Sequence, residues 1–159
     1  SALRIRKFGK FGLLILAMKV QEFMVPAADV ATVTETDKIA TVIDLMLSKH
    51  ISAVVVVQGQ KAVAVVSKTD IVKAYKLDFS KDAEVKDIMS KELFTVDSNH
   101  DRDRAARSFE ANKTHHAVVV DDDGNFAGFI SAWDIAKECV LDDRAWPWIR
   151  QKDGKLTPY

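Results

Sequence analysis

One pattern of residues occurs twice in this chain, and this repetition constrains the fold more than any other feature. The stretch "VVSKTDIVKAY" at 65–75 returns as "FISAWDIAKEC" at 129–139, so that Ser67 and Ser131 lie 64 residues apart. The period exceeds the 20–50 residues of solenoid repeats and predicts two domain-sized copies. The same offset aligns Lys49 with Lys113, "AVVV" 53–56 with "AVVV" 117–120 and Lys73 with Lys137, and an offset of 65 aligns "VQEFM" 20–24 with "VKDIM" 85–89.

Each copy predicts the same order of elements: a short strand, an amphipathic helix, two strands joined by a Gly-containing turn, and a closing helix. The valine strands are apolar almost throughout, so both of their faces need cover. We therefore expect an α+β (α/β) fold of two β-α-β-β-α units, related by a pseudo-twofold axis, with the sheets packed together and two clefts between the units. The predicted helix stripes contain Ile39, Val42, Ile43, Met46 and Leu47 in the first copy and Ala105, Ala106 and Phe109 in the second.

The repeats divide the chain into five stretches. The boundaries follow from the repeat offsets and from a short polar connection between the copies. They are an N-terminal basic and apolar segment at 1–19, a first unit at 20–76, a linker at 77–84, a second unit at 85–140 and a C-terminal tail at 141–159.

Composition excludes several classes of protein. The 23 Lys and Arg residues balance 23 Asp and Glu residues, which disfavours non-specific nucleic-acid binding. The apolar run "FGLLILAM" is too short to span a bilayer, so we expect no membrane association. Cys139 is the only cysteine, which favours a reducing, cytoplasmic location. An organellar matrix is the alternative, if the basic N-terminus is a remnant of a targeting peptide.

The repeated Ser-x-x-Asp pattern has two interpretations. It is typical of a capping box, in which the serine oxygen accepts from a helix amide and the acid side chain accepts from the serine amide. It also suits a nucleotide, because a helix start favours phosphate and a serine can donate to it. The aspartate would instead accept from both hydroxyls of a ribose. The residues alone leave both interpretations open.

Beyond these residues, the chain resembles tandem cystathionine-β-synthase (CBS) domains, known as Bateman modules. The resemblance covers roughly residues 20–140 and rests on "VQEFM"/"VKDIM", the valine strands and "AVVSKTDI"/"GFISAWDI". It implies a ribose–phosphate element in each copy. The second copy keeps the family's glycine as Gly128, whereas Ala64 replaces it in the first, so the second site is expected to be the main one. The implied residues are Ser67, Asp70, Ser131 and Asp134.

Two segments are also similar to the gamma subunit of AMP-activated protein kinase. "KHISAVVVV" resembles its adenine-recognising segment, which implies a role for Ile51, Ser52 and Ala53. The stretch "NKTHHAVVV" implies that His115 faces phosphate and that His116 replaces an arginine. An imidazole is mostly neutral at pH 7, so a phosphate held there is expected to bind more weakly as the pH rises.

Other candidate sites have simpler explanations. Adjacent strand residues point to opposite faces, so His115 and His116 do not predict a metal site, and no metal is expected. "DDDGN" at 121–125 lacks the ligand spacing of a calcium loop and predicts a hairpin turn. A solvated helix face is expected at Arg102, Arg104 and Arg107. A tail that packs on the module or marks a partner surface is expected at Trp146, Pro147 and Trp148.

These expectations describe a regulatory module without catalysis. No nucleophile, base and orienting group come together in the pattern, so we expect neither enzyme activity nor a catalytic cofactor. The expected ligand is AMP, ADP or ATP, ahead of S-adenosylmethionine or NADH, and the expected partners are a second copy and an unidentified protein target. The alternative is a ligand-free scaffold that dimerises and binds proteins, in which Ser-x-x-Asp only caps helices.

Overall fold

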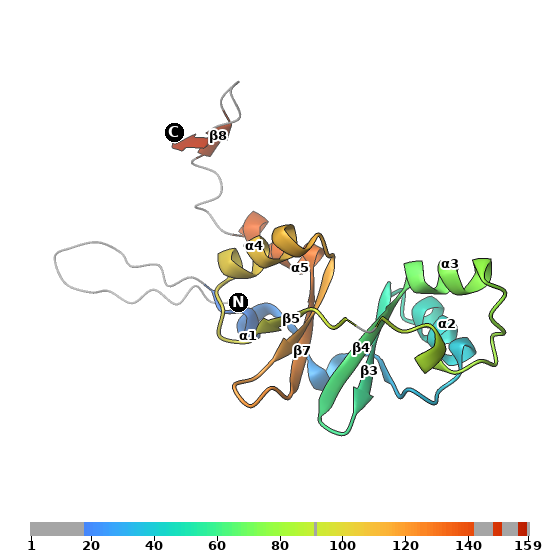
Figure 1. Ribbon diagram of the computed structural model, residues 1–159. Helices are drawn as coiled ribbons and strands as arrows, with labels where there is room; N and C mark the ends of the chain where they lie inside the picture. Colours follow the sequence, from blue (N-terminus) through green and yellow to red (C-terminus); the bar gives the residue numbers. More distant parts are fainter. Residues whose placement is uncertain (1–17, 91, 142–147, 151–155, 159) are drawn as a thin grey trace.

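The computed structural model describes residues 18–90, 92–141, 148–150 and 156–158. Its two larger sheets lie side by side with helices around them (Figure 1). The predicted β-α-β-β-α order is confirmed in both repeats. The first repeat contains α1 (Val20–Phe23), β1 (Val25–Pro26), η1 (Ala27–Asp29), β2 (Thr32–Val33), α2 (Ile39–Ser48), β3 (Ala53–Gln58), β4 (Lys61–Ser67) and α3 (Lys68–Lys76). The second contains η2 (Val85–Asp87), β5 (Thr95–Asp97), α4 (Arg102–Asn112), β6 (His116–Val120), β7 (Phe126–Ser131) and α5 (Ala132–Leu141), and β8 (Trp148–Arg150) pairs with β9 (Leu156–Pro158) beyond it.

The two sheets share one topology. β2 runs parallel to β3, which pairs antiparallel with β4, and β5, β6 and β7 repeat this arrangement. Parallel strands cannot be joined by a tight turn. A helix therefore connects the parallel pair of each repeat, with α2 between β2 and β3 and α4 between β5 and β6. The second sheet has one more strand, because β1 pairs antiparallel with β7.

The strand register corrects the alignment of the two valine segments by one residue. Ser67 lies opposite Ala53 in the first hairpin, whereas Ser131 lies opposite His116 in the second. The strands β3 and β6 are therefore related by an offset of 63, and β4 and β7 by the predicted 64. Identical valine runs align at either offset, and the extra residue lies in the turn between β6 and β7. This matters because a shift of one residue moves every side chain of a strand to the opposite face.

The ends of the preceding helices support the same offset. His50 after α2 has a φ of 54° and Lys113 after α4 has a φ of 49°. These are the left-handed residues that end the two helices, so the counterpart of Lys113 is His50, and the predicted pairing with Lys49 is wrong.

The predicted helix stripes are largely confirmed. Ala105 and Phe109 are buried in the second repeat, and Ala106 packs against them. In the first repeat Leu47 is 68% exposed, contrary to the prediction, and Leu45 packs on the core instead. The buried stripe of α2 is narrower than the apolar sequence pattern. It contains Ile39, Val42 and Met46.

The first segment of each repeat packs on the other repeat. We call residues 20–26 the first arm and residues 85–89 the second arm. The Val20 amide donates to His100 O at 2.9 Å, and the Val85 amide donates to Asp37 O at 2.8 Å. The arms thus make equivalent backbone hydrogen bonds, each to the repeat to which it does not belong in sequence.

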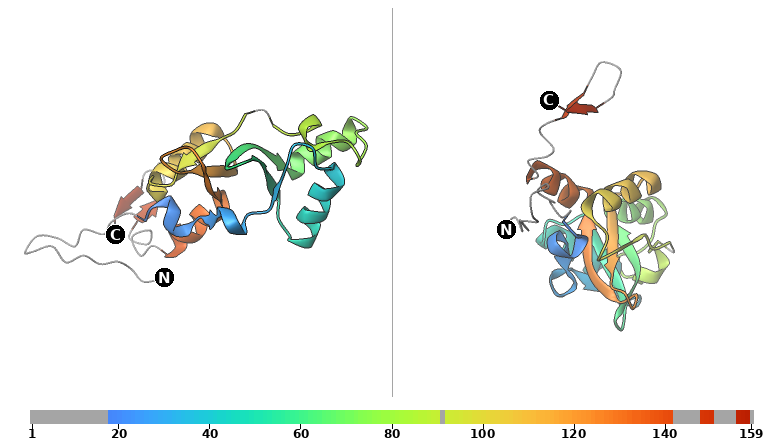
Figure 2. Two further views of the ribbon diagram at one scale, coloured as in Figure 1. Left: turned by 90° about the horizontal axis from the view of Figure 1, so that it is seen from below. Right: turned by 90° about the vertical axis from the view of Figure 1, so that its left-hand side faces the viewer.

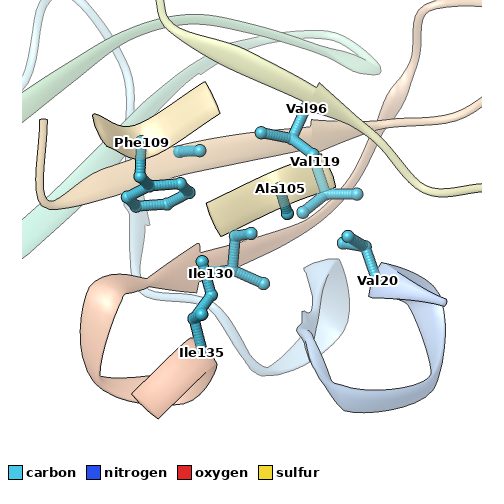
Figure 3. Packing of buried hydrophobic residues seen from close by; sticks show 8 residues of the cluster. Val20, Val96, Ala105, Phe109, Val119, Ile130 and Ile135 are labelled. Atoms are coloured by element: carbon cyan, nitrogen blue, oxygen red, sulfur yellow. The ribbon is translucent and has the colours of Figure 1, made fainter. Parts of the chain in front are cut away.

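The buried side chains follow the same exchange. Val20 is fully buried in the core of the second repeat (Figure 3), and the first arm lies among the elements of that repeat in each view (Figure 2). Val85 is fully buried in the core of the first repeat. Neither core is complete without the arm of the other repeat. The second-repeat core contains Val20, Val96, Ala105, Phe109, Ala117, Val119, Ile130 and Ile135, and the first-repeat core contains Val33, Val42, Met46, Val54, Val56, Ala64, Val66 and Val85.

The remaining faces of the two valine strands are buried between the repeats. Val55 and Val118 alternate with the core residues of β3 and β6, and both are fully buried outside the two cores. The hairpin turns also meet, because the Phe126 amide donates to Gln60 O at 2.9 Å. Lys61 Nζ lies 3.4 Å from Gly124 O in the same contact. The sheets therefore pack together, as the apolar strands predict.

Gly128 lets the first arm approach β7. A Cβ atom built on Gly128 would lie 2.5 Å from Val25 O and 2.6 Å from Met24 Sδ. The backbone pairing of β1 with β7 explains this closeness, since Pro26 lies opposite Gly128. Ala64 takes the equivalent place in β4, which has no such strand beside it in the described residues. Close packing of the arm is thus sufficient to explain the glycine.

We expect Gly128→Ala to lower the free energy of unfolding by about 1–3 kcal/mol, because the backbone oxygen of Val25 cannot move away cheaply. Urea denaturation measures this loss, and hydrogen exchange should show faster exchange in residues 20–26. Gly59→Ala is the control, because Gly59 has a positive φ but no atom within 4 Å of a built Cβ. Equal losses without faster exchange in the arm would contradict the close-approach explanation.

Candidate functional site

Both Ser-x-x-Asp segments form capping boxes. The Ser131 amide donates to Asp134 Oδ2 at 2.8 Å, the Ser131 hydroxyl donates to the same oxygen at 2.7 Å, and the Asp134 amide donates back to Ser131 Oγ at 3.3 Å. Ser67 and Asp70 make the same three bonds at 2.8, 2.7 and 3.4 Å. The capping interpretation is therefore confirmed at the starts of α3 and α5.

Capping occupies only one oxygen of each carboxylate. Asp70 Oδ1 lies 3.9 Å from Lys73 Nζ, which forms a weak surface pair. Within the described residues, no hydrogen-bond donor or cation pairs with Asp134 Oδ1. A carboxylate oxygen without a partner is available to accept from a hydroxyl group, so capping and ribose binding are compatible at Asp134.

The corrected register changes which residues correspond between the two candidate sites. The Lys68 amide donates to Ser52 O, and the equivalent Ala132 amide donates to His115 O. Ser52 is thus the counterpart of His115. The predicted offset of 64 residues pairs Ser52 with His116 and Ile51 with His115, and both pairings are wrong by one residue.

The register also makes the two candidate sites unequal. His116 lies opposite Ser131 across the second hairpin, so their side chains are on the same face. The equivalent neighbour of Ser67 is Ala53, which is buried and has no polar side chain. The second site therefore has an imidazole beside its helix start, and the first site has none.

A hydrogen bond joins candidate residues of the two repeats. Ser52 Oγ and His116 Nε2 are 3.0 Å apart, although the residues are 64 positions apart in sequence. The His116 ring also stacks on Phe129, with the ring centroids 5.7 Å apart and an interplanar angle of 20°. The structure thus brings Ser52, His116, Ser131 and Asp134 together. Ile51 is half-buried against the first core and His115 is exposed.

The surroundings of His116 favour its neutral form. Burial lowers the pKa of His116, the neighbouring His115 lowers it further, and Asp134 opposes both by raising it. A neutral ring is a poor counter-charge for phosphate at pH 7. It is, however, well suited to a hydrogen bond with a hydroxyl group in either direction.

The other candidate motifs have structural roles. In "DDDGN", the Asn125 amide donates to Asp121 Oδ1 at 2.8 Å, and this backbone hydrogen bond is the main cause that lowers the pKa of Asp121. The segment is the predicted hairpin turn, with Gly124 at a φ of 74°. Among the described residues, no group of three or more His, Cys, Asp or Glu side chains could hold a metal ion.

The remaining predictions concern the surface and the termini. Arg104 and Arg107 are exposed, as expected of a solvated helix face. The prediction is wrong for Arg102, whose side chain is only 14% exposed, pairs with Asp103 and donates to Glu138 O of α5 at 3.5 Å. Trp146 and Pro147 lie outside the described residues. No helix in the described stretches is long and apolar enough to cross a membrane.

Sequence reasoning missed Phe129 and the contact between Ser52 and His116. In the sequence, Phe129 is one apolar residue of a predicted strand. Nothing in the pattern shows that its side chain lies on the sheet face that carries His116. The hydrogen bond depends on the register of β6, which the identical valine runs concealed.

We expect the free energy of unfolding to fall as the pH drops below about 6.5. The pKa of His116 is lower in the folded chain than the ordinary value of about 6.5 in the unfolded chain. The unfolded chain therefore binds more protons, and stability present above this pH is lost on acidification. Urea denaturation between pH 8 and 5 measures the loss.

The dependence of the free energy of unfolding on pH should weaken in His116→Gln. It should remain in His50→Asn, since His50 lies exposed on the turn after α2. Unchanged slopes in both variants would show that other groups cause the pH dependence.

Comparison with known proteins supports the arrangement of two repeats. A model of the CBS domain matches residues 20–77 and 85–141. Inosine-5'-monophosphate dehydrogenase of Thermoplasma acidophilum is 30% identical over 129 residues, which cover 80% of this chain and 24% of that protein. The corresponding enzyme of Methanocaldococcus jannaschii is 27% identical over 167 residues, which cover 98% and 32%. The chain thus spans a third or less of these relatives.

Solved structures have the same fold. CBSX2 of Arabidopsis thaliana, a CBS-pair protein crystallised in complex with AMP, has a TM-score of 0.68 at 21% identity and covers 77% of this chain and 96% of its own. A protein with CBS domains from Burkholderia ambifaria has a TM-score of 0.65 at 28% identity, and the match covers 72% of this chain and 85% of that chain. The family match extends over both repeats and more than half of the sequence. This chain therefore belongs to the CBS-domain family, as a tandem pair of CBS domains.

Proposed function

We propose that this CBS pair is a regulatory module that binds an adenine nucleotide of the AMP, ADP or ATP type. The carrying observation is the second helix start, where Asp134 Oδ1 has no partner in the described residues and the His116 ring lies beside Ser131. The AMP complex of CBSX2 supports this ligand class, since that protein has the same fold. The S-adenosylmethionine and NADH alternatives share the ribose diol.

Asp134 accepts from the ribose hydroxyls with Oδ1 while Oδ2 keeps its cap. The start of α5 offers positive dipole and backbone amides to the phosphate. The Ala132 amide is already used by His115 O. Ser131 donates its hydroxyl to Asp134 in the free chain, so it must rotate to donate to phosphate.

Regulation follows from ligand linkage rather than from chemistry. A nucleotide that contacts both repeats favours one relative placement of them, and the bias equals its difference in affinity between placements. An unidentified protein target would respond to that placement. We propose that the chain catalyses no reaction and holds no catalytic cofactor. The proposed location is the cytoplasm.

The second candidate function is a ligand-free scaffold. It is favoured by the complete capping boxes, in which Asp70 and Asp134 already accept two hydrogen bonds each. In a scaffold these residues need no ligand, and the exposed helix faces would carry the function.

We expect AMP at 100 times its dissociation constant to stabilise the chain by about 2.7 kcal/mol, and Asp134→Ala to abolish the AMP-induced rise in Tm. Asp70→Ala should reduce the rise less. Differential scanning fluorimetry with AMP, ADP, ATP, NADH and S-adenosylmethionine gives the ligand class.

Removal of Asp134 also removes a cap, which costs about 1 kcal/mol without ligand. Asp87→Ala is the matched control, because Asp87 Oδ2 accepts from the Glu84 amide at 3.2 Å in an equivalent cap away from the site. It should lower the Tm but keep the ligand-induced rise. No response to any of the five compounds would favour the scaffold.

We also propose that the module is a homodimer. Tyr75 of α3 is 85% exposed and Trp133 of α5 is 77% exposed, and Val72 and Val140 are exposed beside them on the same helices. Each of the two helices thus exposes its own pair of large apolar side chains, and exposed apolar patches are typical of an interface.

Light scattering after size exclusion should give twice the chain mass of 17.7 kDa, and Tyr75→Glu should shift it toward the single-chain mass. Lys76→Gln is the control, because it makes the net charge more negative by the same one unit at the next position of α3. A single-chain mass for the unaltered protein would exclude the dimer.

A further inference from the structure

The hydrogen bond between Ser52 and His116 connects the two candidate nucleotide sites. Ser52 belongs to the segment 51–53 of the first site, and His116 lies beside Ser131 in the second. The two atoms are 3.0 Å apart. Each of the two polar groups therefore has its partner in the other repeat rather than in its own site.

Backbone hydrogen bonds extend this connection to both helix starts. Ser52 O accepts from the Lys68 amide at 3.0 Å, at the first turn of α3. His115 O, one residue before His116, accepts from the Ala132 amide at 2.9 Å, at the first turn of α5. The first turns of α3 and α5 are thus linked through two backbone hydrogen bonds, the covalent backbone at Ser52 and at His115–His116, and one contact between side chains.

We propose that this contact makes nucleotide binding at the two sites positively cooperative. The inference rests on the proposed function. A nucleotide placed against residues 51–53 displaces the exposed Ser52 hydroxyl. A phosphate at the start of α5 accepts a hydrogen bond from Nε2–H of the neutral His116 ring, which needs no charge on the ring. Either event breaks the same hydrogen bond. Binding of the first nucleotide is weakened by the free energy needed to break this hydrogen bond. The second nucleotide binds to a chain in which the bond is already broken, so its affinity is higher.

The expected size follows from the strength of one hydrogen bond. A neutral bond of ordinary net strength corresponds to a factor of about two to ten in affinity. Linkage requires that each site affects the other by the same factor. The effect is reciprocal even though Ala53 replaces the imidazole in the first site.

A double-mutant cycle with AMP tests the coupling in the full chain. NMR titration follows the amide signals of residues 67–76, which report the affinity of the first site. We expect Asp134→Ala, which disables the second site, to weaken AMP binding at the first site about twofold to tenfold. In the Ser52→Ala background, Asp134→Ala should leave the first-site affinity unchanged, because no bond remains to be broken.

Two further variants separate coupling from general damage. Ser52→Thr keeps a hydroxyl group and should restore the dependence on Asp134. Ser48→Ala is the matched control, because Ser48 Oγ donates to Asp44 O within α2 at 2.7 Å. It should keep the dependence at full size.

The outcomes distinguish this inference from the proposed function. If AMP binds at both sites but Asp134→Ala leaves the first-site affinity unchanged when Ser52 is present, the coupling is refuted and nucleotide binding stands. AMP binding at one site only also refutes the coupling. If AMP binds nowhere, the proposed function fails and the inference fails with it.

Discussion

The structure depends on the burial of two valine strands on both faces. Val54 and Val56 of β3 face one core, Val55 faces the other repeat, and all three are fully buried. A single repeat covers only one face with its own helices, so the second sheet must cover the other. This constraint packs the two sheets together around a pseudo-twofold axis, and it therefore brings Ser52 within hydrogen-bonding distance of His116.

The sequence was sufficient to predict the elements and their order, because apolar periodicity and repeated turn residues are local signals. It could not predict the register of β6, since successive valines satisfy either face equally well. The turn after β6 absorbs the extra residue, and no residue type in "DDDGN" marks it as the insertion. The exchange of arms also escaped prediction, because "VQEFM" and "VKDIM" are equally suited to either core.

Part of the candidate site followed from sequence alone. Ser-x-x-Asp predicts a capped helix start, and the hydrogen bonds at Ser131 and Asp134 agree. Sequence could not tell whether capping excludes a ligand. The geometry is compatible with both, because the cap engages Oδ2 of Asp134 and leaves Oδ1 without a partner in the described residues. The roles of His115, His116, Ile51 and Ala53 in ligand binding remain predictions.

The exchange of arms bears on how such a chain could have arisen. One repeat cut from this protein would have an arm that fits the core of a neighbour rather than its own. Two identical ancestral chains could have satisfied each other in that way before gene fusion joined them. In the joined chain the two halves differ in their polar residues, as Ala53 and His116 do, while each core still requires the arm of the other half.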